Sequence, residues 1–464
     1  MNNSVLGKIL SILALGAATA IASSGQTLTT LADLGGNPYY GSLIQATDGN
    51  FYGTTWFGGN TNHGTLLRVT PTGTVTVVYS FCTVQFVCSD GDTPFAVMQA
   101  ADGNLYGTTL YGGAYDGGVL FEISKSGSFS TLYSFANGTT PGAPLVQGPD
   151  GNLYGMAGHT IFRFTPSTGV LTTIVTFPNA IGGAQHLVLA TNGKFYGTTE
   201  QGGVYRDGFF FSLTTAGNLT SLYSFNSVTD GAGRTLTLGT DGNFYGTAQF
   251  SGPNNGGTVF TITSAGQFTL LHSFGSCSIT NCADGTWPTG ALVQGTDGNL
   301  YGGTPLGGTG GINFCRSYCG TAFQITPSGT LTTLYNFCSQ ANCSDGSNPY
   351  QGMVQGTDGN FYGATYSGGA SAGSGGTFYS ISMGLAPFVK PNPTFGQHGW
   401  IISIQGTNLT GATSVTFNGT PASFGVIGPT LIKAQVPAGA TSGTIQVTTP
   451  TGTLNSNVNF QVLP

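Results

Sequence analysis

The stretch TDGNLYGGT at residues 296–304 is one of seven near-copies spread along the chain. The others are TDGNFYGTT (47–55), ADGNLYGTT (101–109), PDGNLYGMA (149–157), TNGKFYGTT (191–199), TDGNFYGTA (240–248) and TDGNFYGAT (357–365). Their Asp or Asn positions are 48, 102, 150, 192, 241, 297 and 358, so the intervals run from 42 to 61 residues. A unit of this length with variable insertions predicts a propeller or a solenoid.

Each unit is expected to hold four strands. In the sixth unit these are GALVQG (290–295), NLYGGT (299–304), GTAFQITP (320–327) and TLTTLYNF (330–337). Asp-Gly between the first two strands predicts a hairpin with a type I′ turn. The fourth copy carries Asn192-Gly193, the other preferred pair for this turn, whereas a metal ligand would have kept its charge. The repeated motif is therefore interpreted as a turn and not as a metal or phosphate site.

The tyrosine of each copy is expected to pack between neighbouring sheets, and the glycine after it to allow close backbone approach. These tyrosines are Tyr52, Tyr106, Tyr154, Tyr196, Tyr245, Tyr301 and Tyr362.

The ends of the repeat region predict a closed ring. The seventh unit has a third strand, GGTFYSISM (375–383), but no fourth strand follows it. The missing strand lies at the other end, where GQTLTTLADL (25–34) matches SGTLTTLYNF (328–337). Closure by this strand removes an open sheet edge. We therefore predict an all-β, seven-bladed propeller of four-stranded blades over residues 24–384.

These repeats resemble the bacterial GloVer tandem repeat of secreted or surface-anchored proteins, on the pattern Q-G-T-D-G-N-L/F-Y-G-T-T followed by G-T-V-F-x-I-T-P-S-G-T-L-T-T-L-Y-S-F. The resemblance implies a location outside the cytoplasm and no shared activity. After a proline-rich linker at 385–393, residues 394–464 show short alternating strands that predict a small β-sandwich. The stretches IQGTNL, ATSVTFNGTPA and GTIQVTTPTG are similar to an IPT/TIG domain, an Ig-like module that implies spacing or binding.

Composition and the N-terminus point to export. Only 6% of residues are charged and the net charge is −6, which excludes a basic nucleic-acid footprint or a polybasic membrane patch. Residues 1–22 hold one lysine, an apolar run and a small-x-small end, as a signal peptide does. The run is too short for a membrane span. We expect a secreted or periplasmic monomer without membrane insertion.

Eight cysteines form four close pairs, and three pairs follow SF or NF and precede Asp-Gly. They are Cys82/Cys88, Cys277/Cys282, Cys315/Cys319 and Cys338/Cys343. Export favours local disulfides, while zinc at Cys315 and Cys319 is the alternative. SDGDTP (89–94) could suggest calcium, but an Asx-type turn explains this loop with fewer ligands. The sequence predicts no metal and no cofactor.

The long loops on one face of the ring are the expected binding region. The aromatic candidates there are Trp56, Tyr111, Tyr115, Tyr205, Trp287 and Tyr318. Aromatic rings beside amides and carboxylates suit sugars, although these rings could simply cap the blade ends. We expect a binding or scaffold protein for an extracellular carbohydrate or a surface protein.

A catalytic function is the alternative, as a lyase or hydrolase on polysaccharides or small molecules. Its candidates are His159, Glu200 and Arg206, which depart from the repeat and could form an acid/base set. The sequence shows no pairing among them. A lyase requires His159 or Glu200 to share a pocket with a second titratable group, whereas a binding protein requires only aromatic rings.

Overall fold

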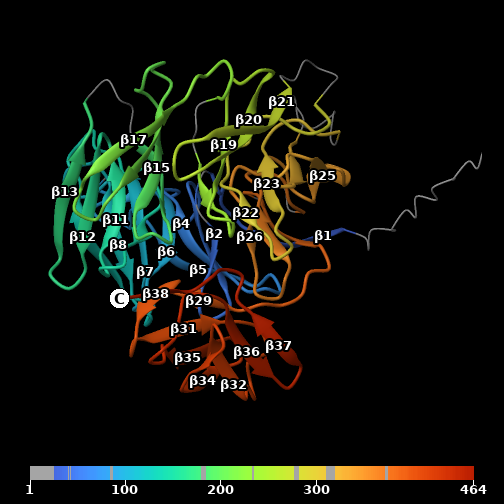
Figure 1. Ribbon diagram of the computed structural model, residues 1–464. Helices are drawn as coiled ribbons and strands as arrows, with labels where there is room; N and C mark the ends of the chain where they lie inside the picture. Colours follow the sequence, from blue (N-terminus) through green and yellow to red (C-terminus); the bar gives the residue numbers. More distant parts are fainter. Residues whose placement is uncertain are drawn as a thin grey trace, which may run out of the picture.

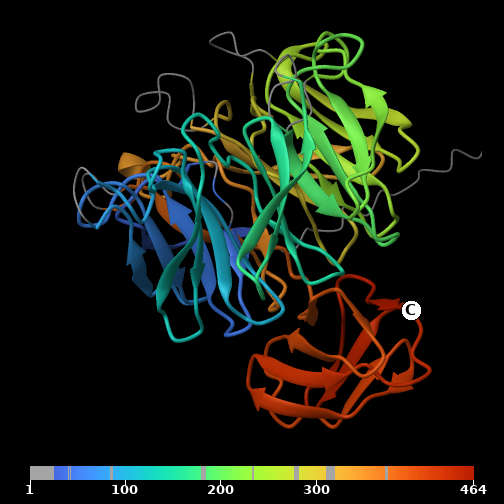
Figure 2. The same cartoon turned by 90° about the vertical axis from the view of Figure 1, so that its left-hand side faces the viewer.

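The computed structural model describes residues 26–39, 41, 43–83, 87–178, 184–231, 235–275, 282–309, 319–370 and 375–464. The strands up to β28 form seven four-stranded antiparallel sheets, the blades of a propeller (Figures 1 and 2). The strands from β29 onward form the Ig-like domain. The predicted fold class is confirmed, and the predicted signal peptide lies outside the described residues.

The first four blades follow the chain order. Blade 1 has β2 (Leu43–Gln45), β3 (Phe51–Thr55), β4 (Thr65–Val69) and β5 (Val75–Ser80); blade 2 has β6 (Asp92–Gln99), β7 (Leu105–Tyr111), β8 (Val119–Ile123) and β9 (Phe129–Ser134); blade 3 has β10 (Val146–Gln147), β11 (Leu153–Ala157), β12 (Thr160–Thr165) and β13 (Val170–Thr176); blade 4 has β14 (Ala184–Leu189), β15 (Phe195–Thr199), β16 (Phe209–Leu213) and β17 (Leu219–Ser224).

The last three blades complete the ring. Blade 5 has β18 (Thr237–Leu238), β19 (Phe244–Ala248), β20 (Asn255–Ile262) and β21 (Phe268–Gly275); blade 6 has β22 (Val293–Gln294), β23 (Leu300–Thr304), β24 (Thr321–Ile325) and β25 (Leu331–Asn336); blade 7 has β26 (Val354–Gln355), β27 (Phe361–Ala364), β28 (Thr377–Ser382) and β1 (Thr27–Asp33). A short 3-10 turn, η1 (Ala341–Cys343), follows blade 6.

The N-terminal strand closes the ring as predicted. β1 pairs antiparallel with β28 in a register that runs from Thr27 opposite Ser382 to Asp33 opposite Thr377. Blade 7 therefore takes three strands from the end of the repeat region and one from its beginning. β1 thereby covers the edge of β28, which would otherwise lack a partner strand, and ties the two ends of the repeat region together.

The hairpin between the first two strands of each blade differs from the type I′ turn that we predicted. In blade 1 the Gly49 N–H donates to the Ala46 carbonyl, and the Ala46 N–H donates to the Asn50 carbonyl. The loop is therefore three residues long, and only its glycine has a positive φ, of 84°. A three-residue loop needs the left-handed conformation at its last residue alone. Asp48 consequently keeps an ordinary backbone conformation.

The aspartate of the motif organises this turn through its carboxylate. In blade 6 the Asp297 carboxylate accepts hydrogen bonds from the Asn299 backbone N–H, the Asn299 side chain and the Tyr301 hydroxyl, at 3.2, 2.8 and 2.8 Å. In blade 4 the tyrosine hydroxyl accepts this hydrogen bond and does not donate it, because Asn192 replaces the aspartate and its amide donates to the Tyr196 hydroxyl at 2.9 Å. The interpretation of the repeated motif as a turn is confirmed.

The hydrophobic core of the ring lies between the blades. Seven clusters of buried side chains each combine residues of two neighbouring blades. Tyr301 stacks on Phe361 of the next blade with ring centroids 3.9 Å apart. In blades 2 to 7 the glycine after the tyrosine makes room for a ring: a Cβ on Gly107 would lie 2.4 Å from the edge of Phe121. Both predictions for the Tyr-Gly pair hold.

A glutamine at the end of the first strand links each of five blades to the blade before it. Gln45 donates from its amide to the Gly49 carbonyl of its own hairpin and accepts from the Thr357 N–H of blade 7. The same pair of bonds is made by Gln99, Gln147, Gln294 and Gln355. This link joins blade 7 to blade 1 by the same chemistry as the other junctions.

The two junctions of blade 4 lack the link. Blades 4 and 5 carry Leu189 and Leu238 at the glutamine position. At the junction between blades 3 and 4 the donor is missing too, since Pro149 has no backbone N–H. Apolar contacts, such as Tyr154 against Phe195 at 4.4 Å, join the two blades at this junction.

We expect Gln45→Leu to lower the free energy of unfolding by about 1–3 kcal/mol, because Gln45 is buried and its loss leaves a backbone donor and a carbonyl unpaired. Urea unfolding monitored by circular dichroism measures the change. Leu238→Gln is the counterpart, since the Thr191 N–H of blade 4 can meet the new acceptor; it should not destabilise the ring. Equal stability of Gln45→Leu and the parent chain would contradict a role for the link.

The Ig-like domain has two four-stranded sheets around one core. One sheet has the order β29 (Lys390–Asn392), β31 (Ile401–Gln405), β35 (Leu431–Gln435), β34 (Phe424–Gly428); the other has β33 (Thr420–Pro421), β32 (Ser414–Phe417), β36 (Ile445–Thr449), β37 (Gly452–Asn455); β30 (Phe395–Gln397) pairs in parallel with β38 (Gln461–Leu463). The core between them includes Ile404, Phe417 and Ile432. β29 lies within the stretch 385–393 that we predicted as a linker, so the domain boundaries stay a prediction.

The Ig-like domain lies against the hairpin face of the propeller, which we define as the face carrying the first-to-second-strand turns (Figure 1). Gln405 donates to the Ala46 carbonyl at 2.7 Å, and Thr430 donates to the Thr47 carbonyl at 3.3 Å. Thr357 and Thr407 join their hydroxyls at 2.8 Å. The opposite face, which carries the blade-to-blade connections and is called the long-loop face below, is not covered by this domain.

Candidate functional site in the axial cavity

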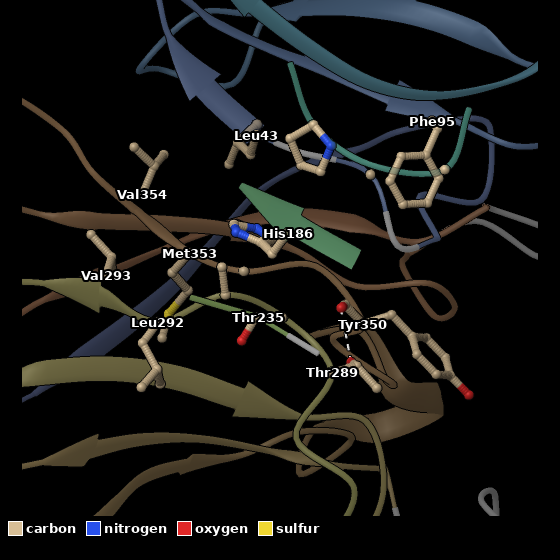
Figure 3. A pocket seen from close by; sticks show the side chains of 16 residues that line it. Leu43, Phe95, His186, Thr235, Thr289, Leu292, Val293, Tyr350, Met353 and Val354 are labelled. Carbon is tan, nitrogen blue, oxygen red and sulfur yellow. Dashed lines mark hydrogen bonds between the residues drawn. The ribbon is translucent and has the colours of Figure 1, made fainter. Parts of the chain in front are cut away.

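A cavity of about 400 Å³ lies on the ring axis at the end toward the long-loop face. All seven blades line it. The first strand of each blade is the innermost strand of its sheet, and the residues at its beginning lie near the axis. The principal side chains are Leu43, Phe95, Pro144, His186, Thr235, Thr289, Leu292, Val293, Tyr350, Met353 and Val354 (Figure 3). None of the described lining residues is Asp, Glu, Lys or Arg. The cavity therefore favours an uncharged ligand.

His186 is the polar group that stands out in this lining. It lies on β14, and Figure 3 shows its ring among Leu43, Met353 and Thr235. Its Nδ1 atom is buried and has no hydrogen-bond partner among the residues that the structure describes. Burial lowers the pKa of His186 to about 4, so the imidazole is neutral at pH 7 and brings no charge to the cavity lining.

His186 was not among the residues predicted from the sequence, although its position in the repeat is occupied by small residues in the other blades. The same position in the first strand is Ala96, Pro144, Thr235, Ala291 or Gly352 in other blades. A histidine among small residues breaks this rule. The period-two pattern of a strand identifies which side a residue faces, but only the closed ring brings the inner sides of seven strands together.

Aromatic rings gather beside the cavity at the junction of blades 1 and 7. Tyr350 lines the cavity and contacts Tyr39 with ring centroids 4.5 Å apart. Tyr39 in turn contacts Trp56 at 4.6 Å and Tyr366 at 5.3 Å. Of the aromatic residues that we predicted for binding, Trp56 is thus connected to the cavity through two tyrosines.

The other predicted binding residues do not join this group. Tyr111 is exposed at the end of β7, and Tyr115 and Tyr205 are exposed in loops of blades 2 and 4. Trp287 packs on Phe250 with ring centroids 5.0 Å apart. Tyr318 lies outside the described residues. The five aromatic candidates that the structure describes therefore do not form one continuous binding surface, and the role of all six in binding stays a prediction.

The three catalytic candidates lie on blades 3 and 4. His159 is exposed in the turn between β11 and β12, Glu200 directly follows β15, and Arg206 is exposed in the loop before β16. None of them lines the axial cavity. Their participation in a reaction stays a prediction.

The cysteines form disulfides. Cys82 is bonded to Cys88 and Cys338 to Cys343, as predicted. Cys282 and Cys319 are also disulfide-bonded, and their predicted partners Cys277 and Cys315 lie outside the described residues. Sulfur atoms bonded in this way are not thiolate ligands for zinc, and such bonds are typical of exported proteins.

The aspartates beside the cysteines serve as acceptors in their loops. Asp90 accepts hydrogen bonds from the Tyr79 hydroxyl at 2.8 Å and the Thr83 hydroxyl at 3.0 Å. Asp345 accepts from the Tyr335 hydroxyl at 2.8 Å and the Ser339 backbone N–H at 2.9 Å. These bonds agree with the loop-organising role that we preferred to calcium binding. In the part of the chain that the structure describes, no helix has the length and apolarity to span a membrane.

Solved structures with similar folds are distant in sequence. The extracellular domain of a protein described as a hybrid two-component system from B. thetaiotaomicron aligns with a TM-score of 0.51 at 13% identity, over 94% of this chain and 54% of that one. An oligogalacturonate lyase in complex with manganese aligns with a TM-score of 0.50 at 14% identity, over 78% and 94%. At this identity the likeness shows the fold alone.

A comparison with curated protein sequences finds no match. Two family profiles do match. The Gloeobacter/Verrucomicrobia repeat matches residues 14–184 and 157–379, and the IPT/TIG domain matches residues 389–462. The repeat matches cover most of the propeller, and the second match covers the Ig-like domain. The chain therefore belongs to the Gloeobacter/Verrucomicrobia repeat family and carries a C-terminal IPT/TIG domain.

Proposed function

We propose that this protein is an exported, non-enzymatic binding protein that holds the end of an extracellular carbohydrate chain in the axial cavity. The observation that carries the proposal is the cavity of about 400 Å³ with rings, hydroxyls and a neutral imidazole but no charged residue in its described lining. The disulfides support a location outside the cytoplasm.

The chemistry of the lining suits a sugar. Phe95 and Tyr350 offer aromatic rings for the apolar face of a pyranose, and His186 and Thr235 offer polar atoms for its hydroxyls. A cavity on the axis suits the end of a chain better than a flat protein surface. A surface protein held by the surrounding loops is the other occupant that we consider.

The function is tested by thermal unfolding with a panel of soluble neutral glycans and polygalacturonate. A ligand at a hundred times its dissociation constant should add about 2.7 kcal/mol to the free energy of unfolding. We expect a response to a neutral glycan that is lost in Tyr350→Leu and weakened in His186→Leu. Tyr111→Leu is the matched control, because Tyr111 is exposed outside the cavity.

The outcomes separate the candidate functions. A response that survives in Tyr350→Leu but not in Tyr111→Leu would move the site away from the axis. No response to any glycan would contradict carbohydrate binding and favour a surface protein as the ligand. New reducing ends in the responding glycan, released by the parent chain and not by a His159→Ala or Glu200→Gln variant, would establish the lyase or hydrolase alternative instead.

A further inference from the structure

A second cavity, of about 370 Å³, lies between the propeller and the IPT/TIG domain, on the hairpin face and away from the axial cavity. The ends of the innermost strands form its propeller side, and residues 390–395 with Gln405 form its other side. The propeller side is apolar at Ile44, Met98, Val146, Leu187, Val188 and Leu189. The cavity is large enough for a short hydrocarbon chain.

Lys390 brings an amine to this apolar space. It begins β29, which pairs with β31, and Asn392 on the same strand donates to the Gln99 carbonyl of blade 2. Because side chains two residues apart lie on the same face of a strand, Lys390 points toward the propeller as Asn392 does. Lys390 lines the cavity.

The amine of Lys390 has no counter-charge. Among the described residues it makes no hydrogen bond or ion pair. The described lining contains no other titratable residue, on either the propeller or the IPT/TIG side. Burial lowers the pKa of Lys390, since its charged form loses solvation without gaining an anion. The side chain is half-buried against apolar walls, and, within the described part of the chain, its ammonium lies there without an anion to pair with.

We propose that the interdomain cavity binds a carboxylate that carries an apolar chain. The carboxylate pairs with the Lys390 ammonium, and the chain lies against the apolar ends of the inner strands. Such a ligand matches both features of the cavity at once, whereas a hydrophilic anion uses only the lysine and a neutral hydrocarbon uses only the walls. This site is separate from the axial cavity and does not depend on the proposed carbohydrate binding.

The test is isothermal titration of the full chain with octanoate, next to octanamide and inorganic phosphate. We expect octanoate to bind more than about tenfold more tightly than either, because charge-assisted pairing and apolar burial act together. Lys390→Met should weaken octanoate binding more than about tenfold. Lys194→Met, which removes an exposed lysine of blade 4, should leave it unchanged.

Proton uptake gives a readout that packing alone would not move. The carboxylate raises the pKa of Lys390 from its lowered value. At a pH between the pKa of the free chain and that of the complex, binding therefore takes up protons, and the binding heat should vary with the buffer's ionisation enthalpy. Lys390→Arg keeps a cation that is always protonated. It should retain octanoate binding and lose the proton uptake.

Each contrary result overturns the proposal. Octanoate that does not bind, or that binds Lys390→Met as well as the parent chain, removes the role of the lysine. Octanamide that binds as tightly removes the role of the charge, and phosphate that binds as tightly removes the role of the apolar walls. Unchanged melting of Lys390→Met shows that any loss of binding is not a loss of fold.

Discussion

A chain that begins at residue 35, and therefore lacks β1, is expected to lose the cooperative unfolding transition of the propeller and to associate through the exposed edge of β28. β1 supplies a full antiparallel partner for β28. Its Leu28 packs on the core between blades 6 and 7, and Leu31 and Ala32 pack on the core between blades 7 and 1. Leu28 and Leu31 are partly buried, and each lost leucine contact costs up to about 2–5 kcal/mol, so the loss of the whole strand removes a large part of the stability of a typical domain.

Calorimetry and size-exclusion chromatography measure this effect. A chain that begins at residue 26 keeps β1 and is the control. A synthetic peptide of residues 26–34 should restore part of the transition when it is added to the shortened chain, because it can pair with β28. The prediction fails if the chains that begin at residues 26 and 35 melt at the same temperature as monomers.

Above pH 10 the propeller is expected to lose stability steeply. Burial and the hydrogen bond to the motif aspartate raise the pKa of the turn tyrosines, for example that of Tyr245 to about 12. The same direction holds for Tyr52, Tyr106, Tyr154, Tyr301 and Tyr362. The folded state therefore keeps protons that the unfolded chain releases near pH 10, so their contribution is complete below that pH and is lost as the pH rises.

Each of these tyrosines can remove up to about 1.4 kcal/mol per pH unit from the free energy of unfolding. Urea unfolding at a series of pH values from 8 to 11 measures the slope. Tyr154→Phe is the matched variant: it loses the hydrogen bond to Asp150 but also one titrating group, so its slope should be smaller by about that amount. A slope unchanged by this substitution would contradict the role of the turn hydroxyls.

The sequence predicts much of this architecture because each blade is a local unit. Alternating residues, Asp-Gly turns and the match between residues 25–34 and 328–337 were enough for strands, blade number and ring closure. The turn type was wrong because loop length depends on where pairing stops: Thr47 lies in the loop, and this removes the need for a positive φ at Asp48.

The sites were harder to predict because they form where distant segments meet. His186 is an ordinary position within one strand until seven strands converge on the axis. Lys390 lies in a stretch whose prolines suggested a linker, and its surroundings exist only because the IPT/TIG domain covers the hairpin face. Tyr111, Tyr115 and Tyr205 are exposed as expected, but exposure does not determine whether two rings lie together.

The leucines at positions 189 and 238 also affect how the ring moves. A closed ring can open only where two neighbouring blades separate. Both junctions of blade 4 lack the glutamine link. Outward displacement of blade 4 therefore breaks no glutamine link, whereas displacement of any other blade breaks at least one. Because β14 of this blade carries His186, such breathing would widen the axial cavity beside the imidazole. Leu189, which stands where other blades have a linking glutamine, and His186, the histidine of the cavity, lie on the same strand.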